Sequence, residues 1–252
     1  MNAPVLTLDV DWAPDWVIDE VAAILIANRV RATWFVTHAS PAIERLKNHP
    51  TIFELGIHPN FLPNSTQGED QDQIIDYLLA IVPKPRSVRT HALFQSTRLL
   101  VHMFKKIPTL RVDVSIFTPH VKHWEPVEFH YENVCGCRFP YIWEDDSEMY
   151  RPHPIWEYAE LGPIAGWRIM DFHPIHIVLN DPTMESYRLL KRMCPRLSEV
   201  TPDDVARFRK AGAGPRTMFE QAVETAHATG QGGLTISDLA DLIGGPSGCR
   251  RR

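Results

Sequence analysis

Short runs of apolar and β-branched residues alternate with segments of helical periodicity through most of this 252-residue chain. The runs predict strands at 5–10, 31–37, 51–57, 87–91, 110–117 and 167–172, with two more between 127 and 143. The other segments predict helices at 15–28, 40–48, 74–82, 96–106 and 217–228. Strands separated by helices pair in parallel through right-handed crossovers. The chain is therefore predicted to be an α/β protein. Without internal repeats or low-complexity linkers, residues 1–252 are expected to form one domain.

Composition excludes several classes of protein. The net charge is -5 and apolar residues make up 44% of the chain, so no basic excess favours binding to nucleic acid or an anionic membrane surface. No stretch approaches the roughly 20 apolar residues of a membrane span. The N-terminus lacks the basic and apolar regions of a signal peptide, which predicts a cytoplasmic protein. The sequence leaves the oligomeric state open.

Two carboxylates, Asp9 and Asp11, follow the first apolar strand. Residues i and i+2 of an extended chain point the same way, so the two carboxylates should repel unless a cation lies between them. A divalent metal resolves this conflict, because one carboxylate can bind it while the other accepts a proton from bound water. The alternative is a strand-to-helix turn in which Asp11 caps the helix. Glycosyltransferases and aspartyl-phosphate phosphatases also use an Asp-x-Asp pattern after a first strand.

Histidines and an arginine occupy the ends of later predicted strands. His58 ends the third strand and would suit zinc or nickel as a neutral imidazole. Arg89 and His91 share one face of the fourth strand, where Arg89 could keep Asp9 ionised and His91 could bind the metal or the substrate. His173 ends a late strand and is predicted to be a general acid. Because catalytic groups of parallel barrels gather at the carboxyl ends of strands, these positions are expected to meet.

Taken in order, the segments from about residue 6 to 179 resemble the polysaccharide deacetylase superfamily (NodB homology, carbohydrate esterase 4). Within it they look most like the deacetylase-like proteins of O-antigen clusters. The resemblance implies an irregular, TIM-like (β/α)7 barrel with a helical C-terminal part. It assigns Asp9 as catalytic base, Asp11 as metal ligand, His58 as the first histidine of the second motif, Arg89 to the third motif and His173 to the fifth. Residues 143–146 match the acidic and aromatic fourth motif, one acid of which could orient His173.

The second histidine of the family's second motif is replaced by Leu62, which cannot bind a metal. His91 is the predicted third ligand, and Asn60 is the alternative. Zinc is the expected metal, although nickel, cobalt or iron would also suit these ligands.

The implied reaction is metal-dependent hydrolysis of an N-acyl group on a sugar or sugar conjugate in surface-polysaccharide or O-antigen biosynthesis. Four residues are predicted to contact that substrate: Trp12, Asn60, Trp143 and Asp145. Two alternatives stay open. One is a catalytically impaired, carbohydrate-binding relative of the same fold. The other is an aspartyl-phosphate phosphatase with Asp9 as nucleophile, although no lysine lies convincingly at a strand end.

Overall fold

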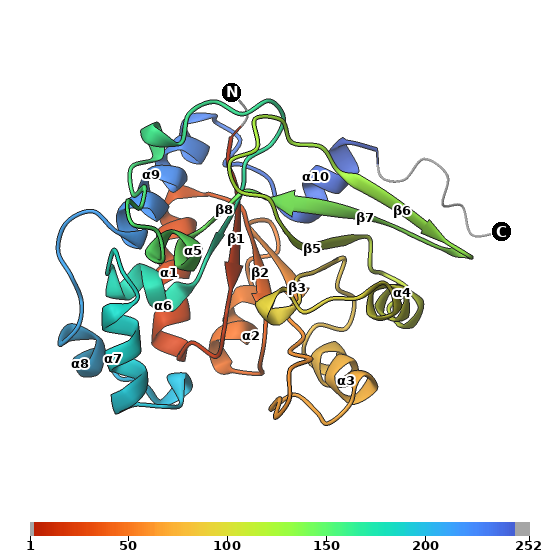
Figure 1. The fold of residues 1–252 in the computed structure, drawn as a ribbon, viewed down its shortest axis with the longest axis horizontal. Coiled ribbons are helices and arrows are strands. Elements are labelled where there is room, and N and C mark those ends of the chain that lie inside the picture. The colour runs from red at the N-terminus through yellow and green to blue at the C-terminus, as the bar shows by residue number, and fades with distance from the viewer. Residues whose placement is uncertain (1–2, 245–252) are drawn as a thin grey trace.

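Parallel strands form the centre of the molecule in the computed structural model, which describes residues 3–244 (Figure 1). The sheet order is β6-β7-β5-β4-β3-β2-β1-β9-β8. The strands are β1 (Val5–Asp9), β2 (Ala32–Val36), β3 (Phe53–Ile57), β4 (Ser87–Val88), β5 (Val112–Phe117), β6 (Val127–Tyr131), β7 (Val134–Tyr141), β8 (Trp143–Glu144) and β9 (Ile169–Phe172). Every neighbouring pair is parallel except β6 and β7, which form an antiparallel hairpin.

One continuous segment joins the two sides of this sheet. Strand β8 follows β7 after the single residue Ile142, and β7 pairs with β5 while β8 pairs with β9. Between the two strands, the Ile142 N–H donates to the carbonyl of Ile169 at 3.0 Å. The chain itself thus links β1, β2, β3, β4, β5, β7–β8 and β9 into a ring, although among the described residues no ladder pairs β7 with β8 or β9 and the sheet is open there. This arrangement confirms the predicted irregular (β/α)7 barrel.

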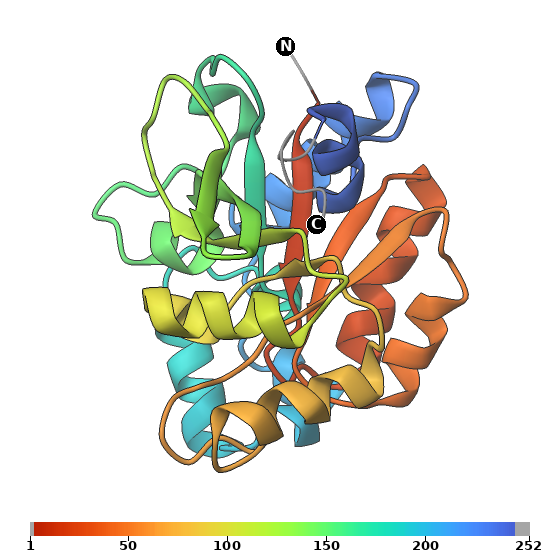
Figure 2. The same cartoon turned by 90° about the vertical axis from the view of Figure 1, so that its right-hand side faces the viewer.

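Helices cover the outside of the ring (Figures 1 and 2). They are α1 (Asp15–Asn28), α2 (Pro41–Lys47), α3 (Gln71–Ile81), α4 (Thr97–Lys106), α5 (Asp145–Met149), α6 (Pro174–Leu179), α7 (Glu185–Met193), α8 (Pro202–Ala206), α9 (Pro215–Ala228) and α10 (Ile236–Leu242), with 3-10 turns η1 (His91–Leu93), η2 (Tyr158–Leu161) and η3 (Leu197–Glu199). Ser96 caps α4 through the N–H of Leu99, as its position in the sequence predicted. Among residues 3–244, no helix combines the length and apolar character that crossing a bilayer requires.

The inside of the ring is apolar at the end where the strands begin. Side chains from the starts of several strands, including Val5, Val112 and Ile169, form one cluster there with Ile236 and Leu239 of α10. Figure 1 shows α10 at the upper end, where β1 starts. Helix α10 therefore closes this end of the barrel.

A partly buried acid holds α10 in place. Glu54 of β3 accepts hydrogen bonds from Thr33, from Ser87 and from both the backbone N–H and the hydroxyl of Ser237 at the start of α10. Because α10 seals this end, polar chemistry inside the ring belongs at the opposite end, where the strands finish.

Candidate active site

The carboxylates that follow β1 reach the site through a strained turn. Asp9 is the last residue of β1, whereas Asp11 and Trp12 adopt left-handed backbone conformations with φ of 44° and 56°. The Trp12 N–H donates to the Thr37 hydroxyl at 3.1 Å, which holds this turn. Asp11 is therefore not in the extended conformation that the sequence predicted, yet Asp9 Oδ2 and Asp11 Oδ1 lie 3.6 and 3.2 Å from the same atom, His58 Nε2. The capping alternative for Asp11 is wrong, since Pro14 occupies the N-cap of α1 without a side-chain hydrogen bond.

Three potential metal ligands lie together at the carboxyl ends of the strands. Asp11 Oδ1 is 3.2 Å from His58 Nε2 and 3.1 Å from His91 Nδ1, and the two imidazole nitrogens are 3.2 Å apart. Two ligand atoms on a tetrahedral zinc ion, each about 2 Å from the metal, lie about 3.3 Å from one another. The triangle of Asp11, His58 and His91 therefore matches the spacing that one such ion requires.

His91 occupies the position that the sequence left undecided. It is the first residue of η1, two residues after Arg89, and its backbone N–H donates to the carbonyl of Pro59 at 3.0 Å. Asn60 does not join the group, because its side-chain oxygen accepts the N–H of Leu62 at 3.0 Å. An imidazole from the fourth strand end thus stands beside His58.

Arg89 organises the polar interior below these ligands. Its guanidinium lies between the rings of Phe35 and Tyr141, 4.6 and 4.4 Å from their centres. Nη1 donates to Asp9 Oδ1 at 2.9 Å and to Asp171 Oδ1. Burial opposes the charge of Arg89, but Asp171 and Asp9 outweigh it and raise the pKa of the guanidinium. Arg89 is therefore a fixed cation that orients Asp9.

Asp171 is a site residue that sequence reasoning missed. Burial raises its pKa well above the ordinary value of a carboxyl, against the opposing effect of Arg89, and its Oδ2 has no hydrogen-bond partner among the described residues. A signal for it existed, because Asp171 lies two residues before His173 and pairs in register with Thr7, two residues before Asp9.

His173 is held by a buried carboxylate. Its Nδ1 lies 2.7 Å from Asp145 Oδ1, and its backbone N–H donates to Asp145 Oδ2 at 2.7 Å. Burial alone would lower the pKa of His173, but Asp145 outweighs it and the pKa is raised well above the ordinary value. The other ring nitrogen is 3.7 Å from Asp11 Oδ2, so a protonated His173 faces the candidate ligand group.

Two predicted substrate contacts require correction. Asp145 is fully buried and uses both oxygens for His173, so it orients that histidine and does not meet a substrate. Trp143 is 3% exposed and packs against Phe172 and Trp156 in the hydrophobic core, where it offers no surface to a sugar ring. Trp12 is only partly buried and stands edge-on to His91, with ring centres 5.3 Å apart.

Glu144 makes the stability of the folded protein depend on pH. Burial, reinforced by Asp146, raises the pKa of Glu144 to about 8, while its side chain accepts a hydrogen bond from the Tyr141 hydroxyl at 3.0 Å. The unfolded chain releases this proton near pH 4.5 and the folded protein only near 8, so the folded state loses stability as pH rises between these values. Glu144→Gln should therefore raise the free energy of unfolding at pH 9 by on the order of 3 kcal/mol.

Urea unfolding of the wild type and Glu144→Gln at pH 4 and pH 9 measures this effect. The two proteins should have similar stability at pH 4, where both side chains are neutral. Glu160→Gln changes an exposed glutamate and serves as the control. An equal difference between Glu144→Gln and the wild type at both pH values would contradict the assignment.

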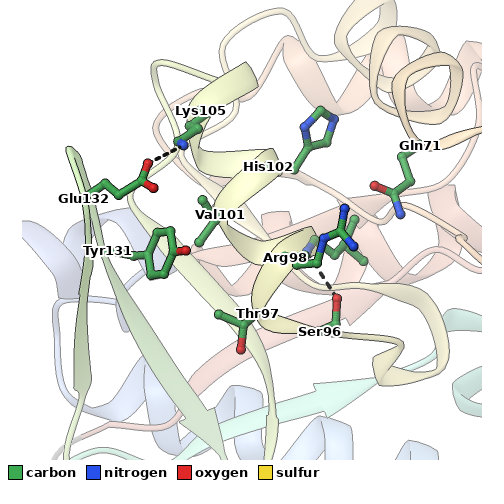
Figure 3. Close-up of a pocket in the computed structure, with 10 residues that line it drawn as sticks. Gln71, Ser96, Thr97, Arg98, Val101, His102, Lys105, Tyr131 and Glu132 are labelled. Atoms are coloured by element: carbon green, nitrogen blue, oxygen red, sulfur yellow. Dashed lines mark hydrogen bonds and ion pairs between the residues drawn. The ribbon is translucent and has the colours of Figure 1, made fainter.

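A groove of about 630 Å³ lies apart from the group formed by Asp11, His58 and His91 (Figure 3). It runs along α4 beside Thr97, Arg98 and Lys105, with Gln71 of α3 on one side and Tyr131 at the hairpin on the other. None of the residues that line it belongs to the candidate ligands or to the Arg89 and His173 clusters.

Comparison with known proteins identifies the family. Residues 6–191, well over half of the chain, match the family described as WbmS-like polysaccharide deacetylase. The chain belongs to this family. It is similar to the crystal structure of WbmS from Bordetella bronchiseptica, which is assigned as a polysaccharide deacetylase involved in O-antigen biosynthesis. That match has 32% identity and a TM-score of 0.72, and it covers 89% of each chain.

Other solved structures share less with this WbmS-like deacetylase. A 4-alpha-glucanotransferase from Thermococcus litoralis is 10% identical with a TM-score of 0.52, covering 97% of this chain and 39% of the other, and shows the fold alone. A family 4 carbohydrate esterase from Streptomyces lividans is 12% identical with a TM-score of 0.45, covering 93% and 91%. No curated protein sequence matches the chain. Family membership confirms the predicted deacetylase resemblance and the predicted class of enzyme, hydrolases of amide bonds.

Proposed function

We propose that this protein is a zinc-dependent hydrolase that removes an N-acyl group from a sugar or sugar conjugate in the assembly of a surface polysaccharide. One observation carries the proposal: the triangle of Asp11, His58 and His91 lies between a carboxylate fixed by Arg89 and an imidazole fixed by Asp145. The polysaccharide is proposed from the similarity to WbmS, whose assignment is to O-antigen biosynthesis.

The donor set fits a divalent cation such as zinc. Burial alone would raise the pKa of Asp11, but His58 and His91 hold it well below the ordinary value, so the carboxylate is ionised as a ligand must be. One carboxylate and two imidazoles are ligands that suit zinc, so Asp11, His58 and His91 would hold the ion. When bound, the ion would polarise the acyl carbonyl and lower the pKa of a water molecule.

Asp9 has the position of a general base. Its Oδ1 accepts from Arg89, while Oδ2 lies 3.6 Å from His58 Nε2 and so faces the candidate ligands. An oxygen at this place can take a proton from the water that attacks the acyl carbon. The hydrogen bond from Arg89 Nη1 to Oδ1 orients this carboxylate.

His173 has the position of a general acid. Asp145 keeps its Nδ1 hydrogen-bonded and stabilises the imidazolium, while Nε2 points toward Asp11. As the carbon–nitrogen bond breaks, the proton on Nε2 can pass to the amine nitrogen, which then leaves as a neutral amine. Trp12, at the edge of the ligand group, offers an aromatic surface to a sugar ring.

Metal content and acetate release test the proposal together. The wild type, loaded with zinc and freed of excess metal, should hold about one equivalent and release acetate from N-acetylated amino sugars. His91→Ala removes one of three ligands, so it should bind zinc at least about 10-fold more weakly and lose activity in proportion. His102→Ala, a histidine of α4 paired with Asp72 outside the site, is the control.

The replacement of the second histidine by Leu62 favours one competing function, a carbohydrate-binding relative without catalysis. Less than about one tenth of an equivalent of zinc in the wild type, with no change on Asp11→Ala, would support that reading. Zinc bound equally well by His91→Ala would remove His91 from the ligand set. Family membership argues against the phosphatase alternative.

A further inference from the structure

The segment between β3 and α3 contains a glutamine, Gln67, whose side chain is buried. Gln67 is 4% exposed, although it lies in an irregular stretch at the surface of the molecule. We propose that Gln67 is the positioning residue of the metal centre, holding the backbone from which the candidate ligands project. This inference rests on the proposed function, because it assumes that the ligand group binds a cation.

The side-chain amide of Gln67 makes three hydrogen bonds to backbone. Nε2 donates to the carbonyl of Thr37 at 2.8 Å and to the carbonyl of His58 at 3.1 Å. Oε1 accepts the N–H of Asn60 at 2.7 Å. One side chain therefore ties together the residue after β2, the first residue after β3 and the loop that follows.

Each candidate ligand connects to this amide within a few bonds. His58 is bonded directly through its carbonyl. The hydroxyl of Thr37 accepts the N–H of Trp12, which holds the left-handed turn that carries Asp11. The backbone N–H of His91 donates to Pro59, the residue between His58 and Asn60. Displacement of Gln67 would therefore loosen the backbone supports of all three ligands.

The ring of His58 has particular need of such support. Metal-binding histidines usually donate their second ring nitrogen to a carboxylate, carbonyl or water, which fixes the ring orientation. Nδ1 of His58 is buried and has no hydrogen-bond partner among residues 3–244. Its orientation is thus set by the backbone and by packing, and Gln67 anchors that backbone.

The loop itself supplies no further ligand, since Leu62 is apolar and Asn60 is engaged within the loop. A loop without a ligand gains nothing from the ion, so it must be ordered by its own contacts. The Gln67 amide provides that order before a cation arrives, which reduces the free-energy cost of binding.

Gln67→Met tests the inference, because methionine keeps the length of the side chain and loses all three hydrogen bonds. Zinc affinity is measured by competition with a chromophoric chelator, at a temperature where circular dichroism shows the metal-free variants fully folded. The affinity of Gln67→Met should fall about 10- to 100-fold, the usual effect of losing a residue that supports a ligand. The control is Gln73→Met, an exposed glutamine of α3 whose amide oxygen accepts only the N–H of Glu69.

A merely structural role for Gln67 would lower the melting temperature of the metal-free protein and leave the zinc affinity of folded molecules unchanged. That result overturns the inference, while the proposed function stands. If Gln67→Met does not fold, Gln67→Glu decides, because a glutamate keeps the acceptor for Asn60 and loses both donors. It should also weaken zinc binding, and wild-type affinity in Gln67→Glu overturns the inference. A wild type that binds no zinc overturns the proposed function as well.

Discussion

Asp9→Asn is expected to lower the turnover of an N-acetylated substrate by about 10²- to 10⁴-fold and to leave zinc binding intact. Asparagine has the shape of aspartate and its amide oxygen can still accept from Arg89, so the surroundings should persist. It cannot accept a proton from water, and it removes a negative charge beside His58 without removing a candidate ligand. The expected loss therefore lies in kcat more than in the occupancy of the metal site.

Acetate release and zinc affinity, measured on the same preparation, separate these effects. Asp19→Asn is the matched control, since Asp19 is an exposed aspartate of α1 that pairs with Arg45. Near-native turnover in Asp9→Asn would show that another group accepts the proton. A loss of zinc that parallels the loss of turnover would place Asp9 among the ligands.

The second large effect is expected on stability. Arg89→Met leaves Asp9 and Asp171 buried without their shared cation, and removing one partner of a buried ion pair costs about 3–5 kcal/mol. Methionine fills much of the space between Phe35 and Tyr141, so lost packing should contribute less than lost charge. Urea unfolding at neutral pH measures the difference.

A double variant separates charge from packing. Arg89→Met combined with Asp9→Asn carries one buried carboxylate fewer, so it should recover part of the lost stability. Arg45→Met, which removes the exposed partner of Asp19, should have little effect because solvent screens that pair. If the double variant is less stable than Arg89→Met, the carboxylate left without Arg89 is not the cause of the loss.

The alternation of strands and helices was readable in the chain because both periodicities are local. The sequence also located Asp9, His58, Arg89 and His173 near strand ends, and parallel strands bring such ends to one side of a sheet. The joining of the two edges of the sheet was not readable in the sequence. It depends on the change at Ile142, where the chain stops pairing with β5 and begins to bond to β9.

The degree of exposure showed which predicted site residues can contact a substrate and which cannot. Trp143 and Trp12 look alike as candidates for stacking on a sugar, but Trp143 packs in the core and Trp12 does not. Asp145 could be placed beside His173 only once α5 and the end of β9 were seen together. Burial depends on what packs over a residue, and no local pattern records it.

By itself, the sequence determined the α/β class, the strand-end positions of the reactive groups and the absence of a second histidine at Leu62, and its resemblance to the deacetylase family implied the barrel. The tertiary structure decided that His91 lies beside Asp11 and His58, that Asp171 shares Arg89 with Asp9, and that Gln67 ties the ligand-bearing backbone together. The physical reason is the range of the interactions. Strand and helix preferences act over a few neighbouring residues, whereas the ligand triangle joins side chains that are 33 to 80 positions apart in the chain.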